Sequence, residues 1–164
     1  MSFQDHEKLH IEKNVKRKLT NTELEILAAE WSEHCSYKSS KKHLRMLPTT
    51  GPNVIVETGY DSGVLDVGDG YVVTVHIESH NHPSAVEPFG GAATGVGGVI
   101  RDILSAGTRP IALFDGLRFG NIENDAHARW LFKNAVSGIA DYGNCLGIPT
   151  IGGEVEFDNC YKNY

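Results

Sequence analysis

The chain has 164 residues, of which 15 are Lys or Arg and 21 are Asp or Glu, so its formal net charge is −6 at pH 7. This balance does not favour a nucleic-acid-binding surface, and no apolar run approaches the roughly 20 residues that a membrane span needs. With no signal-peptide core and no Cys-x-x-Cys pair among three cysteines, the composition predicts a cytoplasmic protein without a disulfide framework or a four-thiolate zinc site.

The first part of the chain predicts an arm, or a short leading element, followed by one helix. Residues 1–19 are polar and weakly patterned. Thr20 and Glu23 then have the spacing of a capping box. Four apolar residues follow on one helical face: Leu24, Leu27, Ala28 and Trp31. We assign residues 1–50 to an N-terminal arm and leading helix, and residues 51–164 to an α/β subdomain.

Three strands are predicted next. Two short runs, 53–57 and 64–67, are separated by a turn rich in glycine and polar residues. Residues 71–78 form the strongest predicted strand, because aromatic and aliphatic side chains occupy every second position on one face. An irregular stretch, 79–91, follows this strand.

The second half of the chain predicts alternating helices and strands. A helix carries an apolar stripe and stops near Gly107; the stripe is Val96, Val99, Ile100, Ile103 and Leu104. A strand at 109–114, with 117–119 continuing it, precedes the clearest helix, which starts at residue 125 and ends before Gly143. A last strand, 148–157, is broken by two glycines. The chain stops soon after this apolar strand, so we expect the subdomain to be truncated at its C-terminal side.

Side chains with catalytic chemistry gather at the end of the predicted strand 71–78. In an extended chain the side-chain period is two, so His76, Glu78, His80 and the nearby His82 share one face. A carboxylate can hold a divalent cation, and an imidazole that titrates near neutrality can move a proton. Together they indicate a functional site more strongly than a packing surface.

A glycine-rich segment follows, at 90–98, and leads into a helix that carries Arg101 and Asp102. Small residues at a helix start let backbone N–H groups approach an anion, although this segment matches neither the Walker-A nor the dinucleotide-binding pattern. A guanidinium beside such a loop can grip a phosphate with two bonds. Asp102 is a candidate second metal carboxylate, with an ordinary surface residue as the alternative.

A third cluster covers residues 31–38 at the end of the first predicted helix. His34 and Cys35 are neighbours in sequence and diverge by about 100° on a helix, which argues against a thiol nucleophile with its base. His34 and Tyr37 are three residues apart and can face the same way, where they could meet a nucleotide. Composition alone leaves them as an ordinary capping region.

Five motifs resemble one enzyme family, phosphoribosylformylglycinamidine synthase in its smaller, multi-subunit form. They lie at 31–38, 77–84, 91–102, 117–120 and 142–149, and the run Glu-Ser-His-Asn-His-Pro within the second is the most specific. The chain resembles the N-terminal part of the synthetase subunit. The resemblance implies the α/β fold of the aminoimidazole ribonucleotide synthetase N-terminal subdomain, with a mixed, mostly antiparallel sheet and helices packed on one face.

The resemblance also implies a reaction, cofactors and partners. Formylglycinamide ribonucleotide would be aminated with ATP and Mg²⁺: its amide oxygen is phosphorylated to an iminophosphate, and ammonia displaces the phosphate. A glutaminase subunit would supply the ammonia, and a small bridging subunit would assist. The family enzyme is several times longer than this chain, so we expect the chain alone to be inactive.

Residue roles follow from the matching motif positions. His34 would be an active-site residue and His80 the proton acceptor; Tyr37 and His76 would contact ATP, and Glu78 and Asp102 would bind Mg²⁺. The residues expected to bind the ribonucleotide are Ser79, His80, Asn81, His82 and Arg101. Two positions depart from the family pattern, because His76 replaces a lysine and Gly90 replaces a commoner glutamine.

Two alternatives use the same residues differently. A zinc hydrolase could use His80 and His82 with Glu78 or His76, since zinc favours imidazole. A non-catalytic domain could instead pair its exposed sheet edge with a partner or a second copy, which predicts a homodimer. The synthase hypothesis requires Glu78 and His80 to face a shared cleft opposite Arg101.

Overall fold

The computed structural model describes residues 4–162 and divides the chain into two compact units, Met1–Thr49 and Thr50–Tyr164. Within the described residues, no helix combines the length and apolar character needed to cross a membrane.

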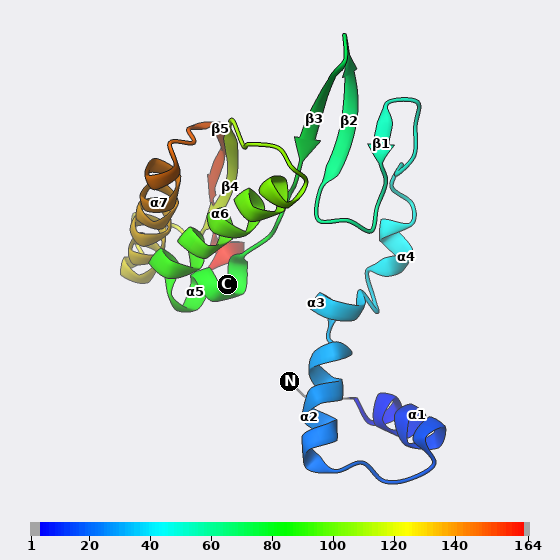
Figure 1. Ribbon diagram of the computed structural model, residues 1–164. Helices are drawn as coiled ribbons and strands as arrows, with labels where there is room; N and C mark the ends of the chain where they lie inside the picture. The colour runs from blue at the N-terminus through cyan, green and yellow to red at the C-terminus, as the bar shows by residue number, and fades with distance from the viewer. Residues whose placement is uncertain (1–3, 163–164) are drawn as a thin grey trace. The chain divides into compact units, whose positions relative to one another are not determined.

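The first unit is helical, with its four helices drawn in blue to cyan in Figure 1: α1 (Asp5–Val15), α2 (Asn21–Glu30), α3 (Glu33–Ser36) and α4 (Lys41–Leu44). The predicted arm therefore contains a full helix, α1, as a leading element, and residues 1–3 lie outside the described part. The sequence did not predict this helix because its apolar pattern is weak, and only Glu7 and Ile11 among the residues of α1 are buried.

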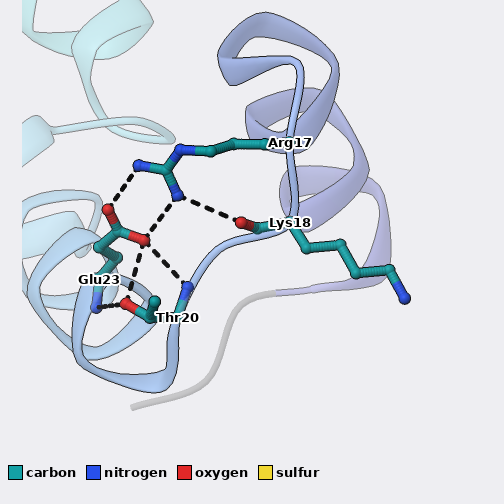
Figure 2. Close-up of polar contacts among 4 residues, drawn as sticks. All are labelled: Arg17, Lys18, Thr20 and Glu23. Carbon is teal, nitrogen blue, oxygen red and sulfur yellow. Dashed lines mark hydrogen bonds and ion pairs between the residues drawn. The ribbon is translucent and has the colours of Figure 1, made fainter.

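Helix α2 begins as the sequence predicts, with Thr20 and Glu23 forming a reciprocal capping box. The Thr20 hydroxyl accepts from the Glu23 backbone N–H at 3.3 Å, and the Glu23 carboxylate accepts from the Thr20 N–H at 2.9 Å. Figure 2 shows the Arg17 guanidinium gripping the same carboxylate through two bonds, of 2.6 and 2.9 Å. The Arg17 bonds, followed by those of Thr20, lower the pKa of Glu23 to about 2.

The second unit starts with an antiparallel sheet of three strands in the order β1 (Val54–Val56), β2 (Gly63–Gly68) and β3 (Tyr71–Val75). Leu65 lies opposite Val73, and the β2–β3 hairpin turns through Asp69 and Gly70, both with positive φ. This backbone suits the twist of a tight hairpin. Strand β3 ends at Val75, three residues before the predicted end.

Two helices, α5 (Asn81–Val86) and α6 (Pro88–Ser105), fill the region predicted as irregular at 79–91. The prediction of an irregular stretch there is wrong, and the glycine-rich segment at 90–98, which the sequence predicts to lead into a helix, lies inside α6. Tertiary contacts outweigh the low helix propensity of glycine, about 1 kcal/mol per residue below alanine. Pro88 at the first turn starts the helix, together with a hydrogen bond that the Gly90 N–H donates to the Glu87 carboxylate.

The remaining elements form a β–α–β unit. Strand β4 (Leu113–Phe119) runs parallel to β5 (Thr150–Phe157), and α7 (Ala126–Leu146) connects them. The predicted stop of α7 at Gly143 is wrong: the helix continues to Leu146 and ends at Gly147, whose φ is 67°. Strand β4 starts later than predicted, at Leu113, and β5 passes through its two glycines without a break.

The core of this unit lies where α6 and α7 meet the two parallel strands, and Figure 1 shows the two helices side by side next to β4. Its buried members are Val96, Ile100, Leu113 and Ile148. Gly138 lets the helices approach closely, since a Cβ there would lie 2.1 Å from the Phe89 carbonyl oxygen. The predicted mixed α/β fold is confirmed, with its strands divided between one antiparallel and one parallel sheet.

Candidate functional site

The extended segment that follows β3 runs antiparallel along α6. His76 Nε2 lies 3.4 Å from the Asp102 carboxylate. Glu78 Oε2 lies 2.7 Å from where a Cβ on Gly98 would be, and His80 Cβ lies 3.0 Å from the same point on Gly95. Two residues of an extended segment span about 6.7 Å, and four residues of a helix span about 6 Å. Alternate side chains of the extended segment therefore contact successive turns of α6. The predicted alternation of positions 76, 78 and 80 is confirmed.

The glycines of α6 provide the room for this contact. A Cβ on Gly91 would also collide with the Ser84 backbone nitrogen, at 2.6 Å. The Glu87 carboxylate already accepts the Gly90 N–H at the start of the helix. The segment therefore lets the neighbouring chain approach α6 closely, and the structure does not support the predicted phosphate-binding loop at this helix N-terminus.

His76 is tied to the protein on both sides of its ring. Its Nδ1 lies 2.5 Å from the Asp61 carbonyl oxygen, which can only accept, so Nδ1 carries the proton. Its Nε2 faces Asp102, and only 17% of the His76 side chain is exposed, against 36% for Asp102. Ser105 links Asp61 to the same part of α6 through a bond of 3.0 Å. His76 thus joins the start of β2 to the carboxylate on α6, and its predicted ATP contact stays a prediction.

His80 lies between the extended segment and α5. Its carbonyl oxygen accepts a bond of 2.6 Å from the Ser84 hydroxyl. Its Nδ1 is buried and has no hydrogen-bond partner among the described residues. Proton exchange with a substrate would therefore use Nε2. Glu78 and Ser79 are exposed, as are Asn81 and His82 at the start of α5.

Arg101 occupies a neighbouring face of α6. It is exposed, and its Nη2 donates to the Tyr142 hydroxyl of α7 at 3.3 Å. Arg101 lies on α6 itself, whereas Glu78 and His80 belong to the extended segment beside that helix, and the expectation that they face one another across a cleft stays a prediction. Successive helical residues diverge by about 100°, which turns Arg101 away from Asp102 and toward α7.

The chemistry of this surface suits a hard cation. Glu78 and Asp102 each present a carboxylate, and Glu78 sits in the space that a side chain on Gly98 would fill. Magnesium commonly takes one or two protein carboxylates together with substrate phosphates. Across residues 4–162, no three or more His, Cys, Asp or Glu side chains are grouped to hold a metal. The zinc alternative, which would use His80 and His82 with Glu78 or His76, stays a prediction.

A hollow of about 720 Å³ lies against α7 and β5, away from the predicted site residues. None of the predicted site residues line it. Its lining is mainly apolar, with Phe132, Val136, Ile139 and Val155 among its members. Its two acidic members are already engaged within the protein, Glu154 with Arg118 and Asp115 with the Thr150 hydroxyl, so we interpret it as a packing surface.

Residues 59–164 match the family of AIR synthase related proteins, N-terminal domain. The chain belongs to this family. Residues 1–38 match a second family, the formylglycinamide ribonucleotide amidotransferase linker domain. The two matches cover the regions that carry the predicted site residues, and the resemblance inferred from the motifs is confirmed.

Two relatives of this AIR synthase related chain are named phosphoribosylformylglycinamidine synthase subunit PurL. The chain is 57% identical to that of Lactobacillus delbrueckii subsp. bulgaricus over 141 residues, which are 86% of this chain and 19% of the relative. It is 51% identical to that of Nitratiruptor sp. over 166 residues, which are 99% of this chain and 22% of the relative. The chain thus spans about a fifth of the curated relatives it matches.

Solved structures of Thermotoga maritima PurL are similar to the chain. The complex with FGAR superimposes with a TM-score of 0.77 at 42% identity, covering 97% of this chain and 24% of the other. The complex with ADP gives a TM-score of 0.74 at 42% identity, covering 93% and 24%. The fold and the AIR synthase related assignment therefore agree with experimentally solved relatives.

Two predicted residues of this AIR synthase related chain, His34 and Tyr37, belong to the first unit. His34 lies in α3, which Ser32 caps, and Tyr37 ends the helix with a φ of 51°. Both side chains are exposed. The predicted roles of His34 and Tyr37 stay predictions.

Several residues that shape the site carried no sequence signal strong enough to single them out. Asp61 acts through its carbonyl oxygen, which every residue has. Tyr142 meets Arg101 only because α6 packs against α7. The polar residues Glu33 and Ser39 are six positions apart, and only the folded turn reveals their contact.

Proposed function

We propose that this chain is part of an enzyme that converts formylglycinamide ribonucleotide to formylglycinamidine ribonucleotide with ATP and ammonia, in cytoplasmic purine biosynthesis. The arrangement of His76, Glu78 and His80 along α6 carries the proposal. The names of the relatives support it. So do the solved complexes of Thermotoga maritima PurL with FGAR, ADP, ATP and AMPPCP. Because the chain spans about a fifth of those relatives, it would be inactive alone.

The reaction needs charge neutralisation and positioning more than a covalent nucleophile. The substrate amide oxygen attacks the terminal phosphorus of ATP and ADP leaves, which gives an iminophosphate. Ammonia then adds to the carbon of the former amide group, and phosphate leaves with the oxygen that this carbon carried. Fixed charges and dipoles around such a transfer provide most of the catalysis.

The residues of the chain divide these tasks. Glu78 and Asp102 would hold Mg²⁺, which neutralises phosphate charge when bound. His80 accepts a proton through Nε2, the ring nitrogen that is not sealed. Residues proposed to bind the ribonucleotide are Ser79, His80, Asn81, His82 and Arg101. His34 completes the active site, and Tyr37 and His76 contact ATP.

Partners follow from the multi-subunit form of the family. A glutaminase subunit would generate the ammonia, and a small bridging subunit would help to deliver it. The word subunit in the relatives' names supports such an assembly. A homodimer of the isolated chain is a second proposal, supported by apolar side chains exposed on the antiparallel sheet, such as Val67 (60% exposed), Tyr71 (72%) and Val75 (50%). A clean monomer in sedimentation at high concentration would argue against that dimer.

The variant His80→Ala tests the catalytic proposal in the full-length protein. We expect it to lose most ammonia-dependent ADP formation, at least about 100-fold, because the proton acceptor is gone. His127→Ala is the matched control, since His127 lies on α7 and stacks on Trp130 away from the site. Circular dichroism should show both variants folded. Wild-type turnover by His80→Ala would refute the role.

A further inference from the structure

One carboxylate in the first unit accepts hydrogen bonds from two consecutive serines. Glu33 Oε2 accepts from the Ser39 N–H at 2.8 Å and from the Ser39 hydroxyl at 2.5 Å. Glu33 Oε1 accepts from the Ser40 N–H at 2.9 Å and from the Ser40 hydroxyl. The Ser39 hydroxyl first, then the other three donors, lower the pKa of Glu33 to about 2. The carboxylate is therefore ionised, and its bonds are charge-assisted, throughout the neutral range.

These bonds close a turn around Tyr37. The Glu33 carbonyl oxygen accepts from the Tyr37 N–H at 3.0 Å, and the Tyr37 carbonyl oxygen accepts from the Lys41 N–H at 2.8 Å. Tyr37 itself has a left-handed backbone, with φ 51° and ψ 33°. A tyrosine stays in this region only where its surroundings fix it, and such residues concentrate at functional sites. Glu33 supplies the bonds on both sides of the turn.

The turn leaves the functional side chains free. Tyr37 is 53% exposed, and His34 is also exposed, whereas Glu33 is half-buried. The Glu33 carboxylate that holds the turn is thus partly shielded from solvent, whereas the side chains proposed to meet ligands are exposed. We propose that Glu33 is a positioning residue, which fixes the turn 37–40 so that Tyr37 is held ready for the nucleotide. This inference rests on the proposed function.

The chain contains a matched control for Glu33. Glu23 is also an ionised carboxylate with a pKa of about 2, held by Arg17 and Thr20 in a comparable network of bonds (Figure 2). It caps α2 and has no bond to the turn 37–40. Glu23→Ala and Glu33→Ala therefore remove similar numbers of bonds from the same unit, and only the second touches the segment of Tyr37.

Two measurements test the proposal. In the 164-residue chain, hydrogen exchange by NMR should be at least about tenfold faster at the Ser39 and Ser40 amides in Glu33→Ala, and unchanged there in Glu23→Ala. In the full-length protein, Glu33→Ala should raise the KM for ATP about tenfold. The KM for the ribonucleotide should stay within about twofold, because the turn holds the nucleotide side. Glu33→Gln, which keeps one acceptor oxygen, should fall between wild type and Glu33→Ala.

Each contrary result has a separate meaning. Unchanged exchange at Ser39 and Ser40 in Glu33→Ala would overturn the frame itself. If Glu33→Ala shows faster exchange but an unchanged KM for ATP, Glu33 has only a structural role and the proposal is overturned. The same holds if Glu23→Ala raises the KM for ATP as much as Glu33→Ala does. Wild-type protein that forms no ADP would overturn the proposed function and the positioning role together, while the exchange result would still report on the turn.

Discussion

The substitution Gly98→Ala should separate stability from function at the surface of α6. A Cβ at this position would lie 2.7 Å from Glu78 Oε2, well inside an ordinary contact of about 3.4 Å. The colliding atom is the end of a flexible side chain, so it can swing away at little cost. The carboxylate has to retreat by about 0.7 Å or more.

The stability change should be neutral or favourable. Alanine in a helix interior gains about 0.8–1.0 kcal/mol over glycine, which corresponds to a rise in Tm of about 2–4 °C for a domain of this size. The turnover rate, in contrast, should fall. Misplacing a metal-binding carboxylate by close to 1 Å costs roughly 10- to 100-fold in turnover. We therefore expect Gly98→Ala to be at least as stable as wild type and much less active.

The assay combines thermal unfolding of the chain with ADP formation by the full-length protein. Gly138→Ala is the control, since its new Cβ would lie 2.1 Å from the Phe89 carbonyl oxygen, a rigid backbone atom. It should lose about 1–3 kcal/mol of stability through overpacking. A Gly98→Ala protein with full activity would refute the reasoning, and so would one destabilised as much as Gly138→Ala.

Two further predictions concern Tyr142 and pH. Tyr142→Phe removes only the hydroxyl that accepts from Arg101, so the KM for the ribonucleotide should rise about threefold to tenfold. The KM for ATP and the Tm should stay unchanged. Steady-state kinetics checks this, and an unchanged KM for the ribonucleotide would contradict it. The pKa values of Glu23 and Glu33 are lowered from 4.5 to about 2, so their stabilisation is fully present above pH 4.5 and is lost as the pH falls toward 2. Acid titration of helicity should show this loss in wild type and a smaller one in Glu33→Gln; equal curves would contradict it.

The sequence predicted the site where local geometry decides the outcome. Side-chain alternation in an extended segment needs no ladder partner, so positions 76, 78 and 80 share a face although β3 ends at Val75. The capping box at Thr20 and Glu23 is equally local, because two residues only three positions apart make both of its bonds.

Predictions that depended on distant contacts were less successful. The stretch predicted as irregular at 79–91 instead holds α5 and the start of α6, where the close approach of the preceding segment requires a glycine at position 91. Gly143 and Gly147 look alike in sequence. Only Gly147 has a positive φ, while Gly143 stays in α7, where a Cβ would lie 3.3 Å from the Ile148 carbonyl oxygen. The division of the strands into two sheets depends on non-local pairing, which one sequence does not specify.

The central claim is that Glu78 and Asp102 on this surface of α6 hold the cation that accompanies the nucleotide. Crystals of the full-length protein grown with Mn²⁺ and an ATP analogue would test it most directly through the anomalous signal of the metal. We predict a peak within about 2.0–2.5 Å of both carboxylates, with the Glu78 side chain lying over Gly98. A peak bound elsewhere, or Glu78 turned away from α6, would contradict the account.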